Sequence, residues 1–471
     1  SIYNSLSSTL RQCSIVKFDS YFKQLSKNQI PEYSLPENIE KIDINIPSEG
    51  LFSEYFYIYK GRGNFKYIPD TLKNEKILSE VYIDDLLIPT SDTIRNLTVL
   101  DMHIQNDLPI LFIGPTGSGK TLCIKHYLNH MIDNSKYSSM FLRFIPRLDS
   151  NKLQAIIHSN LLKHMSFHGE QTRRKNLVII EDINVVATDG YNISQVIEFL
   201  RQILEQEFWI DPTSFVKKEI EHLGFIATIG SEEGFKKKIS KRLLKHFNIF
   251  RTNSLCEDDM LRIYSNVLLV AWKQNGFSSD IAVMTNILTT AFLNVYKFCL
   301  TNFKSSPLKF SYCYNIWDFM KVLRGLFVLK KESSDANKKI HSKIWMHECL
   351  RVFGDRVCGD DEKEILLDKI VEIYEHNFKE SFADTFNGFK REEIGTHIIF
   401  GVNSNERYEE LDRQSSIDNL QEILKKNYAN HRIKTVLFEQ FLTQFFKISR
   451  LLNVENTNGL LIGTSGTGRK T

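Results

Sequence analysis

Residues 110–121 read ILFIGPTGSGKT, a short apolar run followed at once by a glycine-rich loop. The run Ile110–Ile113 is typical of a buried parallel strand, and residues 122–131 continue with helical spacing. Between them, Gly114–Thr121 matches G-x-x-x-x-G-K-[ST], a loop whose backbone N–H groups and following helix N-terminus bind phosphate. The stretch therefore predicts a P-loop site for ATP or a close relative.

Each position of this loop has an expected role. Lys120 is expected to reach the β- and γ-phosphates of ATP or ADP, and the Thr121 hydroxyl is expected to ligate Mg²⁺. The rest of the loop is expected to surround the phosphates: Gly114, Pro115, Thr116, Gly117, Ser118 and Gly119. A chance match is the alternative, and the strand and helix on either side argue against it.

A second buried-strand run, Leu177–Ile180, ends in Glu181 and Asp182. We expect Glu181 to hold the Mg²⁺ shell and Asp182 to activate water as the catalytic base. A strand that merely ends in solvated acids is the alternative. The usual order is Asp then Glu, so the base here is one methylene shorter. A displacement of about 1 Å can cost on the order of a hundredfold in rate, which predicts nucleotide binding with slow hydrolysis.

Apolar strand runs alternate with helical patterns through the middle of the chain. The runs are Ile110–Ile113, Phe141–Ile145, Leu177–Ile180 and Phe225–Ile229. The alternation predicts an α/β fold with a parallel sheet flanked by helices. From Asp258 to about Asn377 only helical patterns occur, which predicts a separate helical subdomain.

The strand pattern returns near the end of the printed sequence. We expect strands at Ile398–Gly401 and Gly459–Ile462, and a helix over Val436–Leu452. A second phosphate loop follows, with Gly463, Gly466, Gly468 and Arg469 as its expected binding residues. Because no helix follows this loop, we expect the sequence to be a piece of a longer chain. The expected divisions are 1–75 (connection), 76–257 (α/β part), 258–377 (helical part) and 378–471 (start of a second module).

Composition narrows the class of protein. The 471 residues carry 60 basic and 57 acidic side chains, a net charge of +3, which predicts no nucleic-acid or membrane partner. The local run Lys236–Lys238, with Lys241 and Arg242, is better explained as a solvated loop than as a basic patch. Seven dispersed cysteines without a Cys-x-x-Cys pair favour reduced thiols in an intracellular protein.

Ordered in this way, the segments resemble the dynein heavy chains over roughly residues 50–471, at the third AAA+ module of the motor ring and the start of the fourth. The resemblance rests on residues 87–93, 114–121, 198–202, 208–209, 241–248, 345–356, 436–438 and 447–450. The string WMHECLRVFGDR at 345–356 is the most specific; its His347-Glu348 pair lacks the second His of H-E-x-x-H, so a structural helix is favoured over a metal site. Arg469 in place of the usual Lys is similar to the axonemal branch.

The resemblance implies roles outside the P-loop. Leu87, Ile88 and Pro89 are expected to line the adenine pocket. Arg242 stands at the arginine-finger position, directed at the nucleotide of a neighbouring module, and Lys245 stands where a second Arg is common.

Two departures from the family pattern weaken the local site. Gly230 replaces a polar sensor, although Thr228 is near it in sequence. Trp317 stands where the helical subdomain normally offers an Arg, and a tryptophan has neither charge nor a fork of donors. Lys321, one turn on, is a partial substitute; a slip of the alignment by one turn is the alternative.

As a whole, the resemblance implies a minus-end-directed, ATP-driven microtubule motor with a regulatory nucleotide site in this module. Its implied partners are other AAA+ modules of the same heavy chain, microtubules bound through other segments, and dynein intermediate and light chains. The implied location is the ciliary or flagellar axoneme, with the cytoplasm as the alternative. Other functions that fit are a different dynein-like ring ATPase and a non-catalytic scaffold that holds ADP.

Overall fold

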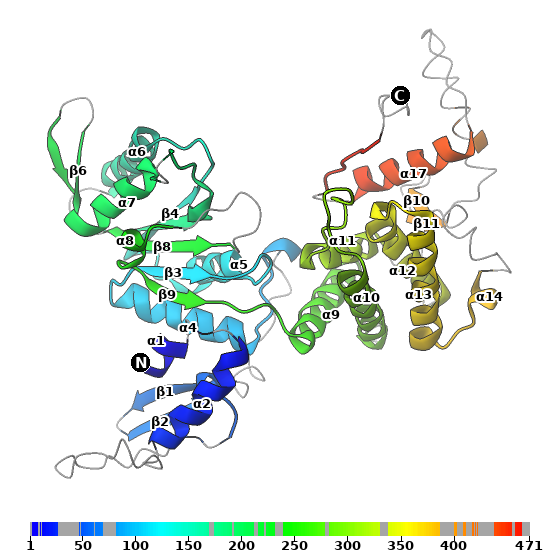
Figure 1. Cartoon of the computed structure of the whole chain (residues 1–471), viewed down its shortest axis with the longest axis horizontal. Coiled ribbons are helices and arrows are strands. Elements are labelled where there is room, and N and C mark those ends of the chain that lie inside the picture. Colours follow the sequence, from blue (N-terminus) through cyan, green and yellow to red (C-terminus); the bar gives the residue numbers. More distant parts are fainter. Residues whose placement is uncertain are drawn as a thin grey trace, which may run out of the picture. The chain divides into compact units, whose positions relative to one another are not determined.

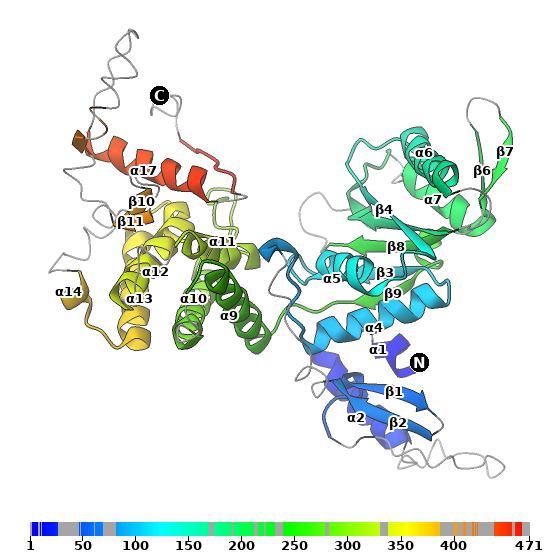
Figure 2. The same cartoon turned by 180° about the vertical axis from the view of Figure 1, so that it is seen from behind.

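A computed structural model describes most of the chain. The described residues are 2–7, 10, 12–26, 47, 49–60, 62–68, 82–168, 174–190, 193–211, 215–220, 223–230, 239–277, 282–329, 338–386, 400–402, 408–410, 417–418, 420, 422, 438–454 and 457–463. The chain divides into two compact units, Ser1–Leu255 and Cys256–Thr471. Figure 1 and, from behind, Figure 2 show the elements of each unit.

The first unit is built on a five-stranded sheet in the order β4-β5-β8-β3-β9, with every neighbouring pair parallel. Its strands are β3 (Ile110–Ile113), β4 (Tyr137–Arg143), β5 (Lys175–Glu181), β8 (Leu223–Ile229) and β9 (Asn248–Arg251). The predicted parallel sheet flanked by helices is confirmed. Strand β9, which no apolar run in the sequence predicts, lies at the sheet edge beside the P-loop strand β3.

Alternate side chains of the strands face opposite helical layers, as the pleat requires. Ile110 and Phe112 pack with α4 (Ser91–Gln105) and α5 (Lys120–His126), whereas Leu111 faces the other side. That other side is covered by α6 (Ser150–His168), α7 (Gln195–Gln206) and α8 (Lys241–Leu244). Full burial of each large aliphatic side chain contributes about 1.5–3 kcal/mol, so both layers fix the sheet firmly.

Two helix boundaries matter for the site. Helix α4 begins after Thr90, whose hydroxyl accepts from the Thr93 N–H in a reciprocal capping arrangement. Helix α5 begins directly after the glycine loop and continues into a π-helical turn, Tyr127–Met131. The helix expected over 122–131 is therefore present, with its last turn widened.

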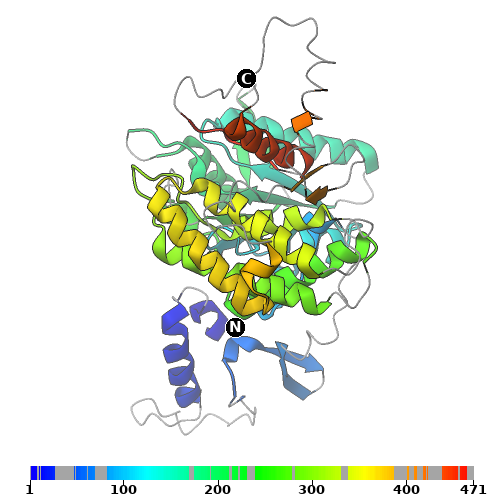
Figure 3. The ribbon, with the colours of Figure 1, turned by 90° about the vertical axis from the view of Figure 1, so that its right-hand side faces the viewer.

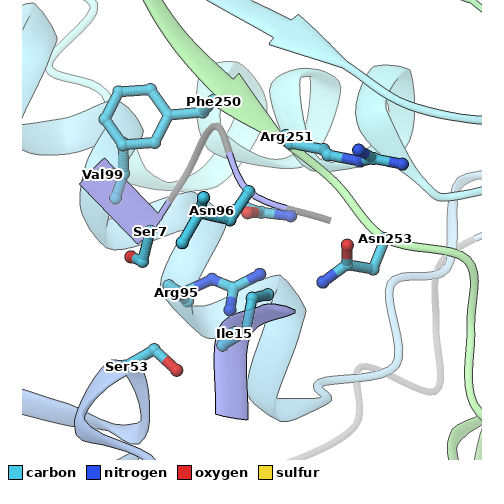
Figure 4. Close-up of a pocket in the computed structure, with 10 residues that line it drawn as sticks. Ser7, Ile15, Ser53, Arg95, Asn96, Val99, Phe250, Arg251 and Asn253 are labelled. Carbon is cyan, nitrogen blue, oxygen red and sulfur yellow. The ribbon is translucent and has the colours of Figure 1, made fainter. Parts of the chain in front are cut away.

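Several smaller elements complete the first unit. They are α1 (Ile2–Ser7), α2 (Gln12–Ser26), η2 (Phe52–Glu54), the hairpin β1 (Tyr55–Lys60) and β2 (Arg62–Tyr67), η3 (Ile83–Asp85), η5 (Ile183–Val185), and the hairpin β6 (Phe208–Ile210) and β7 (Lys217–Glu219). A cavity of about 40 Å³ is lined by residues of the N-terminal elements, α4 and β9, including Ile15, Arg95 and Arg251 (Figure 4). It has room for one or two waters and is too small for a nucleotide.

The second unit is helical over the range expected from the sequence. Its helices are α9 (Glu257–Gln274), α10 (Ala282–Asn302), α11 (Ile316–Phe327), α12 (Lys338–Val352), η8 (Gly354–Arg356), α13 (Asp360–Phe378), α14 (Phe382–Thr385) and α17 (Glu439–Asn453), with the hairpin β10 (Phe400–Val402) and β11 (Tyr408–Glu410). Within the described residues, one stretch, Val283–Asn302, is long and apolar enough to cross a membrane. Its Leu288 and Phe292 are fully buried in the core of this unit, which identifies α10 as the central core helix.

The string at 345–356 joins α12 to α17. Glu348 on α12 forms a two-pronged ion pair with Arg450 on α17, in which Arg450 Nε lies 2.9 Å from Glu348 Oε1; the side chains are 0% and 7% exposed. A Cβ on Gly325 of α11 would overlap the Glu348 carboxylate, so a glycine is needed there. Asp355 Oδ1 forms an ion pair with Lys447 Nζ at 2.9 Å. Figures 1 and 3 show α17, in red, running across one end of this unit.

Some expectations fail or lie outside the described residues. Residues 459–462 do not form the expected strand, and Leu460 and Ile462 are exposed. A buried strand needs partner strands for its backbone groups, and in the described part β10 and β11 pair only with each other. The loop residues Gly466, Gly468 and Arg469, and the run Lys236–Lys238, lie outside the described residues.

Candidate nucleotide-binding site

The glycine loop has the backbone that phosphate binding requires. It leaves the carboxyl end of β3 and enters α5 at Lys120. Gly117 and Gly119 have φ values of 82° and 79°, in the left-handed region that glycine adopts without strain. Consecutive N–H groups of such a turn can face a common centre, so the loop conformation fits an anion-binding cradle.

Lys120 is held inside this loop. Its Nζ donates to the carbonyl oxygens of Gly114 and Pro115, at 2.8 and 2.7 Å, and lies 3.2 Å from Ser118 Oγ. The ammonium is therefore placed over the loop, where an incoming phosphate can take it from the two carbonyls.

Glu181, the last residue of β5, and Asp182 after it lie at the same edge of the sheet as the loop, because β3, β8 and β5 run parallel. Glu181 is mostly buried, and its Oε2 accepts from Arg143 Nε at 3.0 Å, with Arg143 Nη2 also 3.0 Å away. Glu181 Oε1 is buried and has no hydrogen-bond partner. One free carboxylate oxygen at this edge, with the Thr121 hydroxyl on α5, is a donor set that suits Mg²⁺.

Asp182 has an unusual backbone. Its φ of 50° and ψ of 54° place it in the left-handed region, which Asp tolerates better than most residues at a cost of order 1 kcal/mol. Its N–H donates to Thr228 Oγ1 at 3.2 Å. Next to it, Asn184 donates to the Gly230 carbonyl at 3.4 Å. The acid, Thr228 and Gly230 are thus neighbours, and Gly230 contributes only backbone.

The residues expected to hold adenine lie just before α4. Ile88 and Pro89 are buried and Leu87 is partly exposed. The short helix before them, Ile83–Asp85, packs near α5, which follows the P-loop. The segment is therefore tied to the element that follows the loop.

Arg242 lies on α8 with its side chain 67% exposed and Nη1 3.7 Å from Glu198 Oε2 on α7. It lines a groove of about 400 Å³ together with Asn184, Ser194 and Ile197. Lys245 pairs with Glu205 at 3.1 Å. An exposed, loosely paired guanidinium is available to a neighbouring domain, as the finger role requires.

In the second unit, Trp317 is 53% exposed. Its backbone N–H donates to Asn315 Oδ1, and among the described contacts its indole ring makes no hydrogen bond. Lys321 Nζ lies 2.9 Å from the buried Asp318 carboxylate, which also receives Arg356 at 2.9 Å. The expected partial substitute for the lid arginine is therefore engaged within its own unit.

Sequence reasoning missed two residues of this site. Arg143, which holds Glu181, is an unremarkable arginine at the end of β4. Thr252, directly after β9, contacts Ser118 Oγ within the loop and the carbonyl of Ile113, the last residue of β3. Of the second loop only Gly463 is described; it lies in the second unit and is not part of a strand.

Comparisons with known proteins agree with this geometry. Residues 75–255 match the family model described as "P-loop containing dynein motor region", and residues 268–363 match "Dynein heavy chain, ATPase lid domain". The chain is 29% identical to rat dynein axonemal heavy chain 12, over 96% of this chain and 15% of that protein. It is 25% identical to human dynein axonemal heavy chain 3, over 99% of this chain and 12% of that protein.

The chain therefore spans about a seventh or less of the length of these relatives. The two family models fall on the two compact units, the P-loop region on the first and the lid on the second. The chain belongs to the dynein heavy chains, of the axonemal type, and these residues form part of the AAA+ motor region.

Proposed function

We propose that this chain is the third AAA+ module of an axonemal dynein heavy chain, followed by the start of the fourth, and that its Lys120 site is a regulatory nucleotide site. The observation that carries the proposal is the complete phosphate loop beside a weakened set of hydrolytic groups. The site binds ATP or ADP with Mg²⁺ and hydrolyses ATP slowly or not at all.

Binding follows from the loop and its neighbours. The backbone N–H groups of Gly117–Lys120 and the N-terminus of the helix receive the phosphate oxygens, and Lys120 moves from the loop carbonyls to the β- and γ-phosphates. Thr121 and the free oxygen of Glu181 would hold Mg²⁺, which would neutralise part of the phosphate charge when bound. Leu87, Ile88 and Pro89 hold the adenine.

Slow hydrolysis follows from four features. Arg143 competes with Mg²⁺ for Glu181, since it occupies one of the two carboxylate oxygens. Asp182 is short for a catalytic base and sits on a left-handed backbone. Gly230 offers no side chain to orient water, and Lys321 is engaged by Asp318. Each loss is modest, but positioning errors of about 1 Å can cost on the order of a hundredfold in rate.

A regulatory site must transmit its state. Arg242 is exposed and is proposed to reach the nucleotide of the preceding module. The Glu348–Arg450 pair ties the helical unit to α17, which is proposed to belong to the fourth module. These two connections make the module part of a chain of rigid bodies, through which ring movements can pass.

The activity of the whole motor is proposed from the family. The intact heavy chain is proposed to be a minus-end-directed microtubule ATPase of the ciliary or flagellar axoneme, acting with intermediate and light chains. The described residues contribute the nucleotide site and its connections to that activity.

The test uses hydrogen exchange in the intact heavy chain, because other modules also bind nucleotide and a local readout is needed. Protection of the peptide 110–124 is measured as MgATP is added. Wild type is expected to gain protection; Lys120→Ala is expected to lose it, and the exposed Lys125→Ala on the same helix is expected to behave as wild type. Protection that survives in Lys120→Ala, or is absent in wild type, contradicts the proposal.

A further inference from the structure

We propose that Thr252 is a positioning residue of the nucleotide site: its hydroxyl fixes Ser118 and thereby the placement of Lys120. The inference rests on the proposed nucleotide binding and adds to it a residue outside the P-loop motif. Thr252 also connects the loop, through these contacts, to the segment that ends the first unit at Leu255.

Thr252 is anchored on the P-loop strand. Its N–H donates to the Ile113 carbonyl at 2.8 Å, and its Oγ1 lies 3.3 Å from the same oxygen. The residue is 2% exposed. Because both its backbone and its side chain bond to Ile113, Thr252 keeps a fixed position relative to the start of the loop.

From this anchor the hydroxyl reaches the loop. Thr252 Oγ1 lies 3.1 Å from Ser118 Oγ, which lies 2.9 Å from the Pro115 carbonyl and 3.2 Å from Lys120 Nζ. The contacts form a line from Ile113 through Thr252 and Ser118 to Lys120.

The two hydroxyls can adjust when phosphate binds. Each has one proton and a choice of two acceptors. For Thr252 these are the Ile113 carbonyl and Ser118 Oγ, and for Ser118 they are the Pro115 carbonyl and Thr252 Oγ1. Lys120 and Ser118 both donate to the Pro115 carbonyl, whose two lone pairs accept both hydrogen bonds. Once Lys120 moves to phosphate, the hydrogen bond from Ser118 to the Pro115 carbonyl remains, and Ser118 can accept from Thr252, so the loop keeps its shape. Valine at 252 has no proton to give.

Thr252 also packs directly on the first residue of the loop. A Cβ added to Gly114 would lie 2.5 Å from the Thr252 carbonyl oxygen and would overlap its hydroxyl. Glycine at 114 and threonine at 252 therefore form a matched pair. Three residues later the first unit ends at Leu255, and α9 begins at Glu257. Gly114 of the loop therefore packs against Thr252, the first residue after the last strand of the sheet.

The experiment compares variants in the intact heavy chain by exchange protection of peptide 110–124 against MgATP concentration. Thr252→Val removes the hydroxyl at nearly constant volume and Thr252→Ser keeps it. Thr98→Val is the matched control, since the Thr98 hydroxyl bonds only within α4. Loss of one buried hydrogen bond predicts a midpoint about three- to tenfold higher for Thr252→Val. Thr252→Ser and Thr98→Val are expected to stay within about twofold of wild type.

The outcomes separate the two proposals. Absence of protection in wild type contradicts nucleotide binding itself. Protection in wild type with an unchanged midpoint in Thr252→Val, or an equal loss in Thr252→Ser, overturns the role of the hydroxyl. Exchange of the β5 peptide without nucleotide reports whether the sheet is intact. If Thr252→Val unfolds it, Ser118→Ala tests the other end of the contact: a midpoint raised about threefold or more supports the proposal, and an unchanged one overturns it.

Discussion

Replacement of Arg450 by methionine should free α17 from the helical unit. The change leaves the Glu348 carboxylate, which is 0% exposed, without its two-pronged partner. Breaking a buried pair by removing one member costs about 3–5 kcal/mol, because the remaining charge stays desolvated. Gly325 lies against that carboxylate, so the carboxylate has no room to turn toward α11.

The assay is hydrogen exchange of the peptide covering Glu439–Asn453. At 1.36 kcal/mol for each factor of ten, the expected loss of protection is about a hundredfold to several thousandfold. Lys447→Met is the control on the same helix, since its pair with Asp355 is partly exposed and is worth roughly 1 kcal/mol or less. The double variant Glu348→Gln/Arg450→Met should regain part of the loss. Protection within about fivefold of wild type in Arg450→Met would refute this reasoning.

Three further outcomes follow from the contacts. Gly114→Ala should raise the MgATP concentration that gives half-maximal protection of peptide 110–124 by at least about tenfold. The reason is that the added Cβ would lie 2.5 Å from the Thr252 carbonyl oxygen. Arg143→Met should release Glu181 and so lower about two- to fivefold the Mg²⁺ concentration that gives half-maximal protection of peptide 110–124 in the presence of ATP. An unchanged midpoint in this Mg²⁺ titration would contradict competition between Arg143 and Mg²⁺ for Glu181. Burial raises the pKa of Asp318, but hydrogen bonds from Arg356 and Lys321 outweigh it and hold that pKa below 3.8. Their stabilisation is therefore present above about pH 4 and lost as pH falls further, and α11 exchange should follow that loss in wild type but not in Asp318→Asn.

The sequence predicted what local pattern controls. The P-loop, its strand and its helix are contiguous, and β5 and β8 are continuous apolar runs typical of buried parallel strands. Strand β9 was missed because it is four residues long, lies at the edge of the sheet, and has polar residues at both ends, Asn248 and Arg251. An apolar pair between turn residues, Ile249-Phe250, is the one local signal for it.

Long-range contacts were beyond the sequence pattern. Thr252 and Ser118 are 134 residues apart, and Glu348 and Arg450 are 102 apart. The string at 345–356 indicated a family. Its Glu348 forms an ion pair with Arg450 of α17, and sequence spacing alone cannot identify that partner. The strand expected at 459–462 was wrong because apolar character specifies burial only where partner strands exist.

The central claim is that the Lys120 site holds nucleotide and turns it over slowly. The most direct test is the nucleotide retained by the intact heavy chain after rapid gel filtration from MgATP, identified as ATP or ADP over time, in wild type and in Lys120→Ala. We expect the two to differ by one nucleotide per chain, and this nucleotide to stay ATP through many turnovers of the whole motor. Equal retention, or conversion of that nucleotide to ADP at the overall turnover rate, would contradict it.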